Sequence, residues 1–197
     1  LRRQRQMCIR DSIMNTFLQS VQNLDGEILL QIQQHLRTDM LTPLMKFVTF
    51  LGNGGWFWIL CAVVLLAIPK TRKTGYAAAL SLIFGAIVTN LLLKNIVARP
   101  RPFAEIEALI PMITKPKDFS FPSGHTTASF AVALVMLRML PKKFGIPAVV
   151  LAALVAFSRL YLGVHYPTDV LAGFVVALVG SSLAVWGVRT KLGNIKR

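Results

Sequence analysis

The stretch from Tyr76 to Val97 reads YAAALSLIFGAIVTNLLLKNIV and carries a single charged residue, Lys94, near its end. About 20 predominantly apolar residues in a helix cross a hydrocarbon core about 30 Å thick, so this stretch is long enough to span a membrane. A surface helix of a soluble bundle would instead show a polar stripe along one face. The stretch therefore predicts a membrane-spanning helix and argues against a soluble helical bundle.

Similar apolar blocks lie on both sides of this stretch, in a chain whose residues are 54% hydrophobic. The further blocks are Trp56–Pro69, Thr126–Leu140, Ile146–Leu162 and Val170–Val188. We expect at least four of the five blocks to span, and the shorter block from Trp56 is a candidate span. The sequence thus predicts an all-α integral membrane bundle of about five to six transmembrane helices.

The region before Trp56 is less uniform, because charged residues interrupt it. We interpret Asp25–Leu36 as an amphipathic helix that lies at the membrane interface. Thr42-Pro43 is typical of a helix start, with proline at the first helical position. A short or tilted segment then runs to Leu51, before Gly52, and whether it crosses the bilayer is left open.

The first residues do not fit the rest of the chain. Leu1 to Ser12 is basic and has no apolar h-region, so it is no signal peptide, and it resembles translated adapter sequence. Met14 is a candidate for the true start. We therefore expect residues 1–13 to be a non-native or disordered tail and residues 14–197 to form a single membrane-embedded domain. Removing residues 1–13 deletes four arginines and one aspartate, which changes the formal charge from +14 to +11.

The chain stays basic without that tail, and a basic chain often binds nucleic acid. Here, however, the cations lie in short loops between apolar blocks, where they set membrane topology, so no nucleic-acid partner is expected. The clusters are Lys70, Arg72 and Lys73; Arg138, Lys142 and Lys143; and Arg189, Lys191, Lys196 and Arg197. If the last four blocks each cross once, these clusters share one face, which we predict to be cytoplasmic in a multi-pass protein of the plasma membrane.

The same threading brings three polar fragments together at the opposite, extracytoplasmic face. These fragments are Lys94 with Arg101-Pro102, Pro122-Ser123-Gly124-His125, and Ser158-Arg159 with His165 and Asp169. They supply three cations, two imidazoles and one carboxylate, a set suited to binding and cleaving a phosphate ester. Snorkelling towards the interface explains one lysine or arginine, but not three cations that share a face with two histidines.

Two of the fragments predict local geometry. Ser123 is a candidate N-cap whose helix start would offer free amides to an anion, although an ordinary turn is the alternative. Pro167 can open another helix, with Asp169 in its first turn and within reach of His165. A carboxylate bonded to one ring nitrogen would leave the other nitrogen as a nucleophile, and a plain interfacial hydrogen bond is the alternative.

In order and spacing, the three fragments resemble the signature of the type 2 phosphatidic acid phosphatase superfamily. The flanking helices are similar to those of small bacterial members, the undecaprenyl-pyrophosphate phosphatases. The resemblance implies a metal-independent phosphatase, without cofactor, that works through a phosphohistidine. It implies that His165 attacks phosphorus, Asp169 orients His165, and His125 protonates the leaving oxygen.

The resemblance also implies which groups hold the phosphate oxygens: Lys94, Arg101, Arg159, Ser123 and the Gly124 amide. Ser158 would be a supporting hydrogen bonder. Arg99 lies outside the matched positions and is assigned no catalytic role. From the residues alone, the two histidines and Asp169 could also form a metal site, but three neighbouring cations would repel a dication.

The location of the site suggests the substrate. An amphiphile can hold its phosphate at the membrane face and its tail in lipid, so phosphatidic acid, phosphatidylglycerophosphate and isoprenoid pyrophosphates are candidates, with undecaprenyl pyrophosphate preferred. Two alternatives remain: a vanadate-dependent haloperoxidase-like enzyme, and a non-catalytic phospholipid-binding or transport protein. A histidine mechanism predicts activity that survives chelation of divalent metals and a bell-shaped pH profile.

Overall fold

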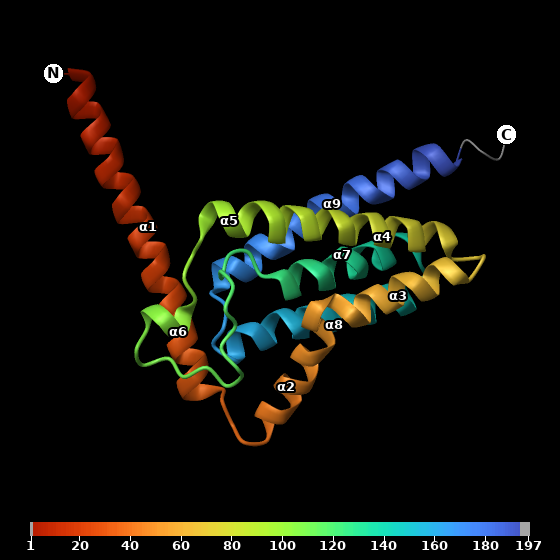
Figure 1. Ribbon diagram of the computed structural model, residues 1–197, viewed down its shortest axis with the longest axis horizontal. Coiled ribbons are helices and arrows are strands. Elements are labelled where there is room, and N and C mark those ends of the chain that lie inside the picture. Colours follow the sequence, from red (N-terminus) through yellow and green to blue (C-terminus); the bar gives the residue numbers. More distant parts are fainter. Residues whose placement is uncertain (1, 194–197) are drawn as a thin grey trace.

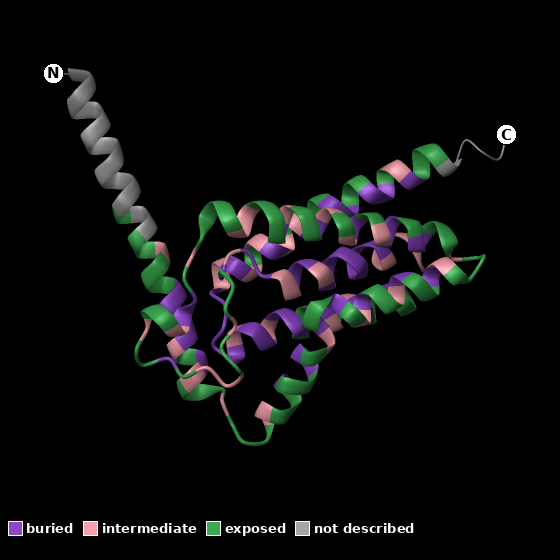
Figure 2. Ribbon diagram, in the orientation of Figure 1, coloured by how far each residue is buried: buried purple, intermediate pink, exposed green. Residues whose placement is uncertain are grey.

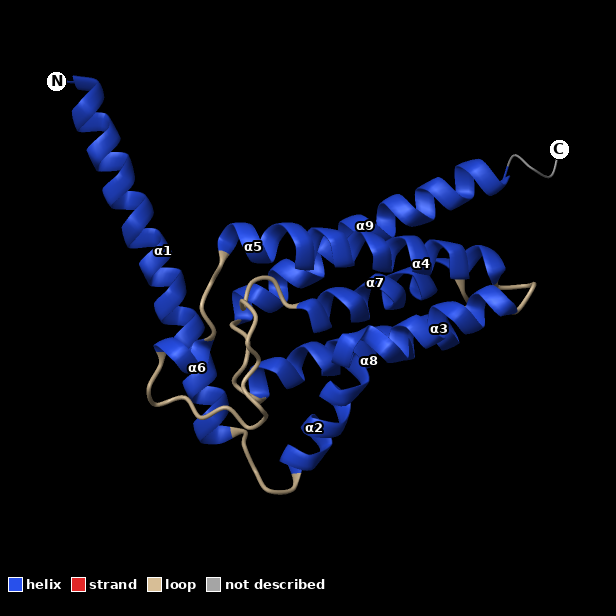
Figure 3. Ribbon diagram, in the orientation of Figure 1, coloured by secondary structure: helices blue, strands red, loops and turns tan. Residues whose placement is uncertain are grey.

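The computed structural model describes residues 2–193, with side chains described at residue 16 and from residue 19 to residue 191. Within that range every regular element is a helix (Figure 3). In chain order the α-helices are α1 (Arg2–His35), α2 (Leu41–Gly52), α3 (Trp56–Ala67), α4 (Arg72–Ala86), α5 (Lys94–Val97), α6 (Pro102–Glu105), α7 (Gly124–Met139), α8 (Lys142–Tyr161) and α9 (Pro167–Gly193). A 3₁₀ turn, η1 (Asn53–Gly55), joins α2 to α3, and a π-helical segment, η2 (Ile87–Leu93), joins α4 to α5. The all-α prediction is confirmed.

Helix α7 forms the centre of the bundle, where it packs against α3, α4, α8 and α9 (Figure 1). Its residues Ala131, Val132, Ala133 and Val135 are completely buried. Small side chains let neighbouring helices approach closely, which is how membrane helices gain packing energy without a hydrophobic driving force. With 16 residues, α7 is shorter than the roughly 20 that a free-standing span needs.

Among the described residues, four helical stretches are long and apolar enough to cross a membrane: Leu41–Ala67, Arg72–Glu105, Lys142–Tyr161 and Pro167–Lys191. Their outer faces are rich in exposed apolar side chains such as Leu60, Leu91 and Leu171, and Figure 2 shows burial concentrated on the inward faces. Such a surface is unfavourable in water and matches a hydrocarbon surround. The chain is therefore a multi-pass membrane protein, as predicted, and the Thr126–Leu140 block supplies the enclosed helix α7.

The segment before Trp56, whose topology the sequence left open, belongs to a helical stretch from Leu41 to Ala67 that bends sharply. Gly54 and Gly55 have φ values of 58° and 70°. Both values lie in the left-handed region that favours glycine. The bend lets α2 turn away from α3 (Figure 1) while the loop between them reaches the head of α7. Asn53 is thereby brought against the first turn of α7.

The predicted amphipathic helix lies within α1. Asp25, Leu29 and Ile32 are buried on one face of it, while Leu24 and Ile28 are exposed. Leu29 packs against Leu109 and Tyr166, which fixes α1 to the loops at one end of the bundle. The predicted helix is thus confirmed, and its position at the membrane interface stays a prediction. The expected boundary between residues 13 and 14 falls inside α1, where side chains are outside the described part, and it stays a prediction.

The two ends of the bundle differ in chemistry. The α3–α4 turn and the C-terminal part of α9 lie at one end, and the loops that carry the polar motifs lie at the other (Figure 1). Arg189 Nη2 donates to the Arg138 carbonyl oxygen at 3.0 Å, so two of the basic clusters are adjacent. Lys196 and Arg197 lie outside the described residues. The motifs and the described basic clusters therefore occupy opposite ends, as the threading required.

Candidate active site

One end of the bundle encloses a cavity of about 1020 Å³. The residues of the predicted site that line it are Lys94, Arg101, Gly124, His125, Arg159 and His165. They come from the start of α5, the following loop, the start of α7, the end of α8 and the α8–α9 loop. Ser123, Ser158 and Asp169 are fully buried outside the lining. The structure thus gathers three cations and two imidazoles around one space.

His165 sits between a carboxylate and a cation. Its Nδ1 lies 3.5 Å from Asp169 Oδ2 and 3.5 Å from Ser120 Oγ, and its Nε2 lies 3.3 Å from Arg101 Nη1. A guanidinium nitrogen can only donate, so this contact assigns the free lone pair to Nε2 and the ring proton to Nδ1. Pro167 begins α9, which places Asp169 one helical turn after His165. The geometry presents a neutral imidazole whose unprotonated nitrogen faces Arg101 at the cavity.

The surroundings of His165 keep it neutral. Burial lowers its pKa from 6.5 to about 4; the hydrogen bond to Asp169 works against this, while the charges of Arg159 and Arg101 add to it. At pH 7 the ring therefore carries no proton on Nε2. A neutral imidazole is the form that can act as a nucleophile.

Both carboxylate oxygens of Asp169 accept hydrogen bonds. Its Oδ2 accepts hydrogen bonds from Ser120 Oγ and from the Tyr166 amide, the latter at 2.9 Å. Its Oδ1 accepts from Arg99 Nη1 at 2.9 Å, although the motif comparison assigned no role to Arg99. A carboxylate fixed in this way can hold the imidazole in one tautomer and one orientation.

Lys94 and Arg101 share one carboxylate, Asp118, which the motif did not identify. Arg101 Nη2 lies 2.7 Å from Asp118 Oδ1, and Lys94 Nζ is ion-paired with Asp118 Oδ2. Burial alone would raise the pKa of Asp118, but hydrogen bonds and charges from Lys94 and Arg101 outweigh it and lower the pKa to about 2. A carboxylate therefore occupies the two cations that an anionic substrate would need.

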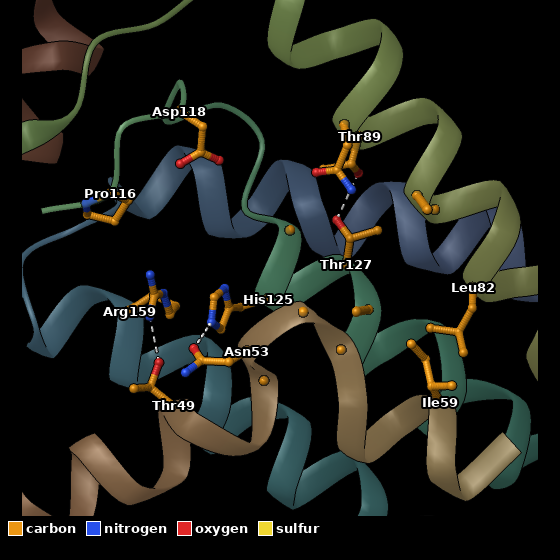
Figure 4. A pocket seen from close by; sticks show the side chains of 18 of the residues that line it. Thr49, Asn53, Ile59, Leu82, Thr89, Pro116, Asp118, His125, Thr127 and Arg159 are labelled. Carbon is orange, nitrogen blue, oxygen red and sulfur yellow. Dashed lines mark hydrogen bonds between the residues drawn. The ribbon is translucent and has the colours of Figure 1, made fainter. Parts of the chain in front are cut away.

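Arg159 offers an unused donor. Its Nη1 donates to Thr49 Oγ1 at 2.6 Å, and its buried Nε has no hydrogen-bond partner among the described residues. Figure 4 shows Arg159 and His125 pointing into the cavity, with Asp118 on the opposite wall. A buried donor without a partner costs free energy unless a ligand or water satisfies it, so this nitrogen is available to donate to an anion or to water.

The Pro122–His125 fragment forms the predicted helix start. Ser123 is the N-cap of α7, and its Oγ accepts from the Thr126 amide at 3.4 Å and the Thr126 hydroxyl at 3.0 Å. The N-cap prediction is confirmed. Because this hydroxyl is buried within the cap, its role as a phosphate ligand stays a prediction; Gly124, one residue later, does line the cavity.

His125 is positioned by the glycine-rich bend between α2 and α3. Its Nε2 lies 2.9 Å from Asn53 Oδ1 (Figure 4). A Cβ on Gly52 would lie 2.7 Å from His125 Cδ2, so the ring packs directly on the backbone there. Ser158, by contrast, donates to the carbonyl oxygen of Val155 in its own helix at 2.6 Å. Its supporting role also stays a prediction.

Away from these polar groups the cavity continues as an apolar channel between α3 and α4. Its walls there are Ile59, Ala62, Val63, Leu66, Leu82 and Ile83. Figure 4 shows Ile59 and Leu82 facing each other at this end. This cavity therefore combines a cationic head with an apolar extension.

Sequence reasoning missed four residues that contact the predicted site: Asn53, Arg99, Asp118 and Ser120. Asn53 lies in a bend, and its histidine partner follows 72 residues later. Asp118 and Ser120 lie in the loop before Phe121. Acidic residues are rare beside the motifs of this basic chain, which was the signal available for Asp118. For Asn53 and Ser120 no local pattern marks a contact.

Comparison with known proteins gives a consistent result. A sequence model described as the PAP2 superfamily matches residues 74–192, a range that includes all the polar fragments from Lys94 to Asp169. An undecaprenyl-diphosphatase of Sulfolobus acidocaldarius is 35% identical over 158 residues, which cover 80% of this chain and 74% of that protein. Undecaprenyl-diphosphatase BcrC of Bacillus subtilis is 36% identical over 142 residues, covering 71% of each.

A solved structure agrees with the sequence matches. The transmembrane PAP2 type phosphatidylglycerolphosphate phosphatase from Bacillus subtilis superposes with a TM-score of 0.69 at 30% identity. The superposition covers 90% of this chain and 89% of that one. The helical arrangement around the cavity is therefore similar to that of a solved membrane protein.

Proposed function

Because this chain belongs to the PAP2 superfamily and is a membrane lipid phosphatase, we propose that it removes the terminal phosphate of a polyprenyl pyrophosphate through a phosphohistidine at His165. The observation that carries the proposal is the environment of His165. Its Nδ1 faces Asp169 and its Nε2 faces Arg101 at the cationic head of the cavity. An imidazole held this way is oriented and neutral before substrate binds.

The first chemical step forms a phosphorus–nitrogen bond. Nε2 of His165 attacks the terminal phosphorus, the bond from phosphorus to the bridging oxygen breaks, and His125 delivers a proton to that oxygen as the lipid monophosphate leaves. Asp169 Oδ2 accepts a hydrogen bond from the Nδ1 proton, which stays on the ring, and stabilises the positive charge that develops there. Water then attacks the phosphohistidine, giving a proton to His125, and inorganic phosphate leaves.

The cations supply most of the stabilisation. Phosphoryl transfer depends on positioning and on charge stabilisation at the equatorial oxygens more than on covalent machinery. We assign those oxygens to Lys94, Arg101 and Arg159, with the Gly124 amide and Ser123 at the head of α7. The unpartnered Nε of Arg159 supports this assignment, since a phosphate oxygen would satisfy it.

The apolar extension of the cavity supports a lipid with a long hydrocarbon chain. A phosphate bound beside His125 and Arg159 leaves the channel between Ile59 and Leu82 for the chain. Two of the relatives are named for undecaprenyl diphosphate, which is such a lipid. We therefore prefer undecaprenyl pyrophosphate to phosphatidylglycerophosphate and phosphatidic acid.

The distribution of charge supports an active site on the extracytoplasmic side of the plasma membrane. Short loops on the cytoplasmic side of a membrane protein are enriched in lysine and arginine. The α3–α4 turn and the α7–α8 junction carry such clusters, and both lie at the end away from the cavity's cationic head (Figure 1). The cavity would then open towards lipids whose phosphate faces outward.

A binding or transport protein with the same pocket is the second candidate. A binder needs the cations but not a nucleophile or an acid, whereas His165 and Asp169 are held in a geometry suited to catalysis. A haloperoxidase-like activity is disfavoured by the membrane-spanning stretches and by relatives named as phosphatases.

The test is phosphate release by detergent-purified protein, with undecaprenyl pyrophosphate and phosphatidic acid assayed side by side. His165→Ala should abolish release. His35→Ala is the matched control, because His35 is exposed at the end of α1 and does not line the cavity. Release that survives in His165→Ala would refute the phosphohistidine mechanism. Faster release from phosphatidic acid than from the pyrophosphate would refute the substrate assignment.

A further inference from the structure

Arg99 joins two buried carboxylates that come from opposite ends of the sequence. Its Nη1 lies 2.9 Å from Asp169 Oδ1, and its Nη2 lies 2.8 Å from Asp25 Oδ2. Asp25 belongs to α1 and is 2% exposed, while Asp169 is completely buried. Arg99 therefore bridges the N-terminal helix and the carboxylate that faces His165.

The bridge is built from several independent contacts. Asp25 Oδ1 accepts from the Thr168 amide at 3.1 Å, and Asp25 Oδ2 accepts from the Thr168 hydroxyl. Arg99 Nη1 also contacts the Thr168 hydroxyl at 2.6 Å. The guanidinium carbon of Arg99 lies 3.7 Å from the centre of the Tyr166 ring. At that distance the cation is attracted to the face of the ring.

These contacts offset the free-energy cost of burying charged side chains. A buried carboxylate is tolerated only when it is paired and its remaining lone pairs are hydrogen-bonded. Asp25 meets both conditions, and so does Asp169. The planar guanidinium of arginine presents its donors in a fixed fork, whereas the lysine ammonium is a compact charge with rotatable donors.

We propose that Arg99 and Asp25 are positioning residues that set the orientation and effective charge of Asp169, and through it the reactivity of His165. The inference rests on the proposed function, in which His165 is the nucleophile. With Oδ1 held by Arg99, Oδ2 of Asp169 is left facing the His165 ring, Ser120 and the Tyr166 amide.

Charge is the second part of the role. The cation of Arg99 offsets part of the negative charge of Asp169, which limits how far Asp169 increases the basicity of His165. Asp25 in turn offsets part of the positive charge of Arg99. Removing either partner should therefore change the His165 basicity in opposite directions: upward without Arg99 and downward without Asp25.

Neither residue touches the space in which substrate binds. Asp25 and Arg99 are absent from the residues that line the cavity, whereas Lys94, Arg101 and Arg159 are present. A change at Arg99 or Asp25 should thus lower kcat and leave KM nearly constant, which is the pattern of a lost transition-state interaction. Loss of a residue that supports a metal ligand typically costs about 10- to 100-fold in activity, and we expect a loss of that order here.

The experiment measures kcat, KM and the pH dependence of kcat/KM with undecaprenyl pyrophosphate for full-length protein in detergent. The variants are Arg99→Gln, Arg99→Lys and Asp25→Asn. Arg37→Gln is the matched control, because Arg37 also ties the end of α1 to the loops, through the carbonyl oxygens of Tyr161 and Ile110, without touching Asp169.

The charged and titratable groups that act on His165 are Arg101, Arg159, Asp169 and His125, and all of them remain in every variant. We expect kcat to fall about 10- to 100-fold in Arg99→Gln and Asp25→Asn, with KM within about twofold of wild type. The acid limb of kcat/KM should move to higher pH in Arg99→Gln and to lower pH in Asp25→Asn. Arg99→Lys keeps the charge, so its limb should stay at the wild-type pH while kcat is intermediate. This variant also carries the test if Arg99→Gln does not fold.

The inference is overturned if Arg99→Gln and Asp25→Asn keep the wild-type kcat. It is also overturned if both variants lose activity while the acid limb of kcat/KM stays at the wild-type pH, because a merely destabilising change such as Arg37→Gln would give that result. His165→Ala separates this failure from failure of the proposed function. If His165→Ala is inactive and the Arg99 variants behave as wild type, only the positioning role is wrong. If His165→Ala is active, the proposed function itself is wrong.

Discussion

Replacing Asp118 with asparagine should strengthen phosphate binding. Asp118 holds both Lys94 and Arg101, so a phosphate must displace it from these two cations. The fall in the Asp118 pKa from 3.8 to about 2 corresponds to roughly 2 kcal/mol in favour of the charged carboxylate. The side chain is 52% exposed, so solvent screening reduces this to about 1 kcal/mol. Phosphate should then bind Asp118→Asn roughly fivefold more tightly than wild type.

The assay is isothermal titration of inorganic phosphate into detergent-purified protein at pH 7. Glu107→Gln is the matched control, because Glu107 is an exposed acid in the same loop and lies outside the cavity lining. This control should change the dissociation constant by much less than fivefold. Equal or weaker binding by Asp118→Asn would refute the reasoning, since it would mean that Asp118 holds Lys94 and Arg101 in place for phosphate and does not compete with it.

Three other outcomes are expected. Gly52→Ala should lower kcat by at least about tenfold, because the new Cβ would lie 2.7 Å from the His125 ring and overpacking displaces side chains. The control is Gly187→Ala, where a Cβ meets nothing within 4 Å, and it should keep the wild-type kcat. The acid limb of kcat/KM, corrected for substrate ionisation, should lie nearer pH 4 than pH 6.5. Burial and the nearby arginines lower the His165 pKa to about 4, so the reactive neutral form is lost only below that pH. An acid limb at the ordinary histidine value would contradict this. Phosphate release should be unchanged by EDTA, and a clear loss would favour metal catalysis.

The architecture could be predicted well, because membrane helices are recognisable by their length and apolar composition. The block from Tyr76 to Val97 and the later blocks each correspond to helices of the bundle. The central position of α7 was not predictable in this way. Its 16 residues differ little in composition from the outer helices, and only packing against its neighbours buries Ala131 and Ala133.

The site was predictable where spacing encodes contact. His165 and Asp169 are separated by one helical turn, and Ser123 directly precedes α7, so local geometry fixed both. Contacts between distant segments carry no such signal. The Asn53–His125 contact depends on the bend at Gly54 and Gly55, and the sequence did not reveal where that bend would point.

Arg99 illustrates the same limit. It lies two residues before Arg101, yet the two arginines act in different places. Arg101 lines the cavity, whereas Arg99 lies behind it between Asp25 and Asp169. Sequence position cannot separate them, because the separation depends on where α1 packs, and α1 is far away in the chain.

Whether His165 carries the phosphoryl group can be tested by locating the site of phosphorylation. Protein would be mixed with undecaprenyl pyrophosphate labelled at its terminal phosphate, quenched in alkali within milliseconds, and analysed by mass spectrometry of its peptides. We expect a phosphohistidine at His165 in wild type and no labelled protein in His165→Ala. Label on another residue, or active protein that never carries label, would contradict it.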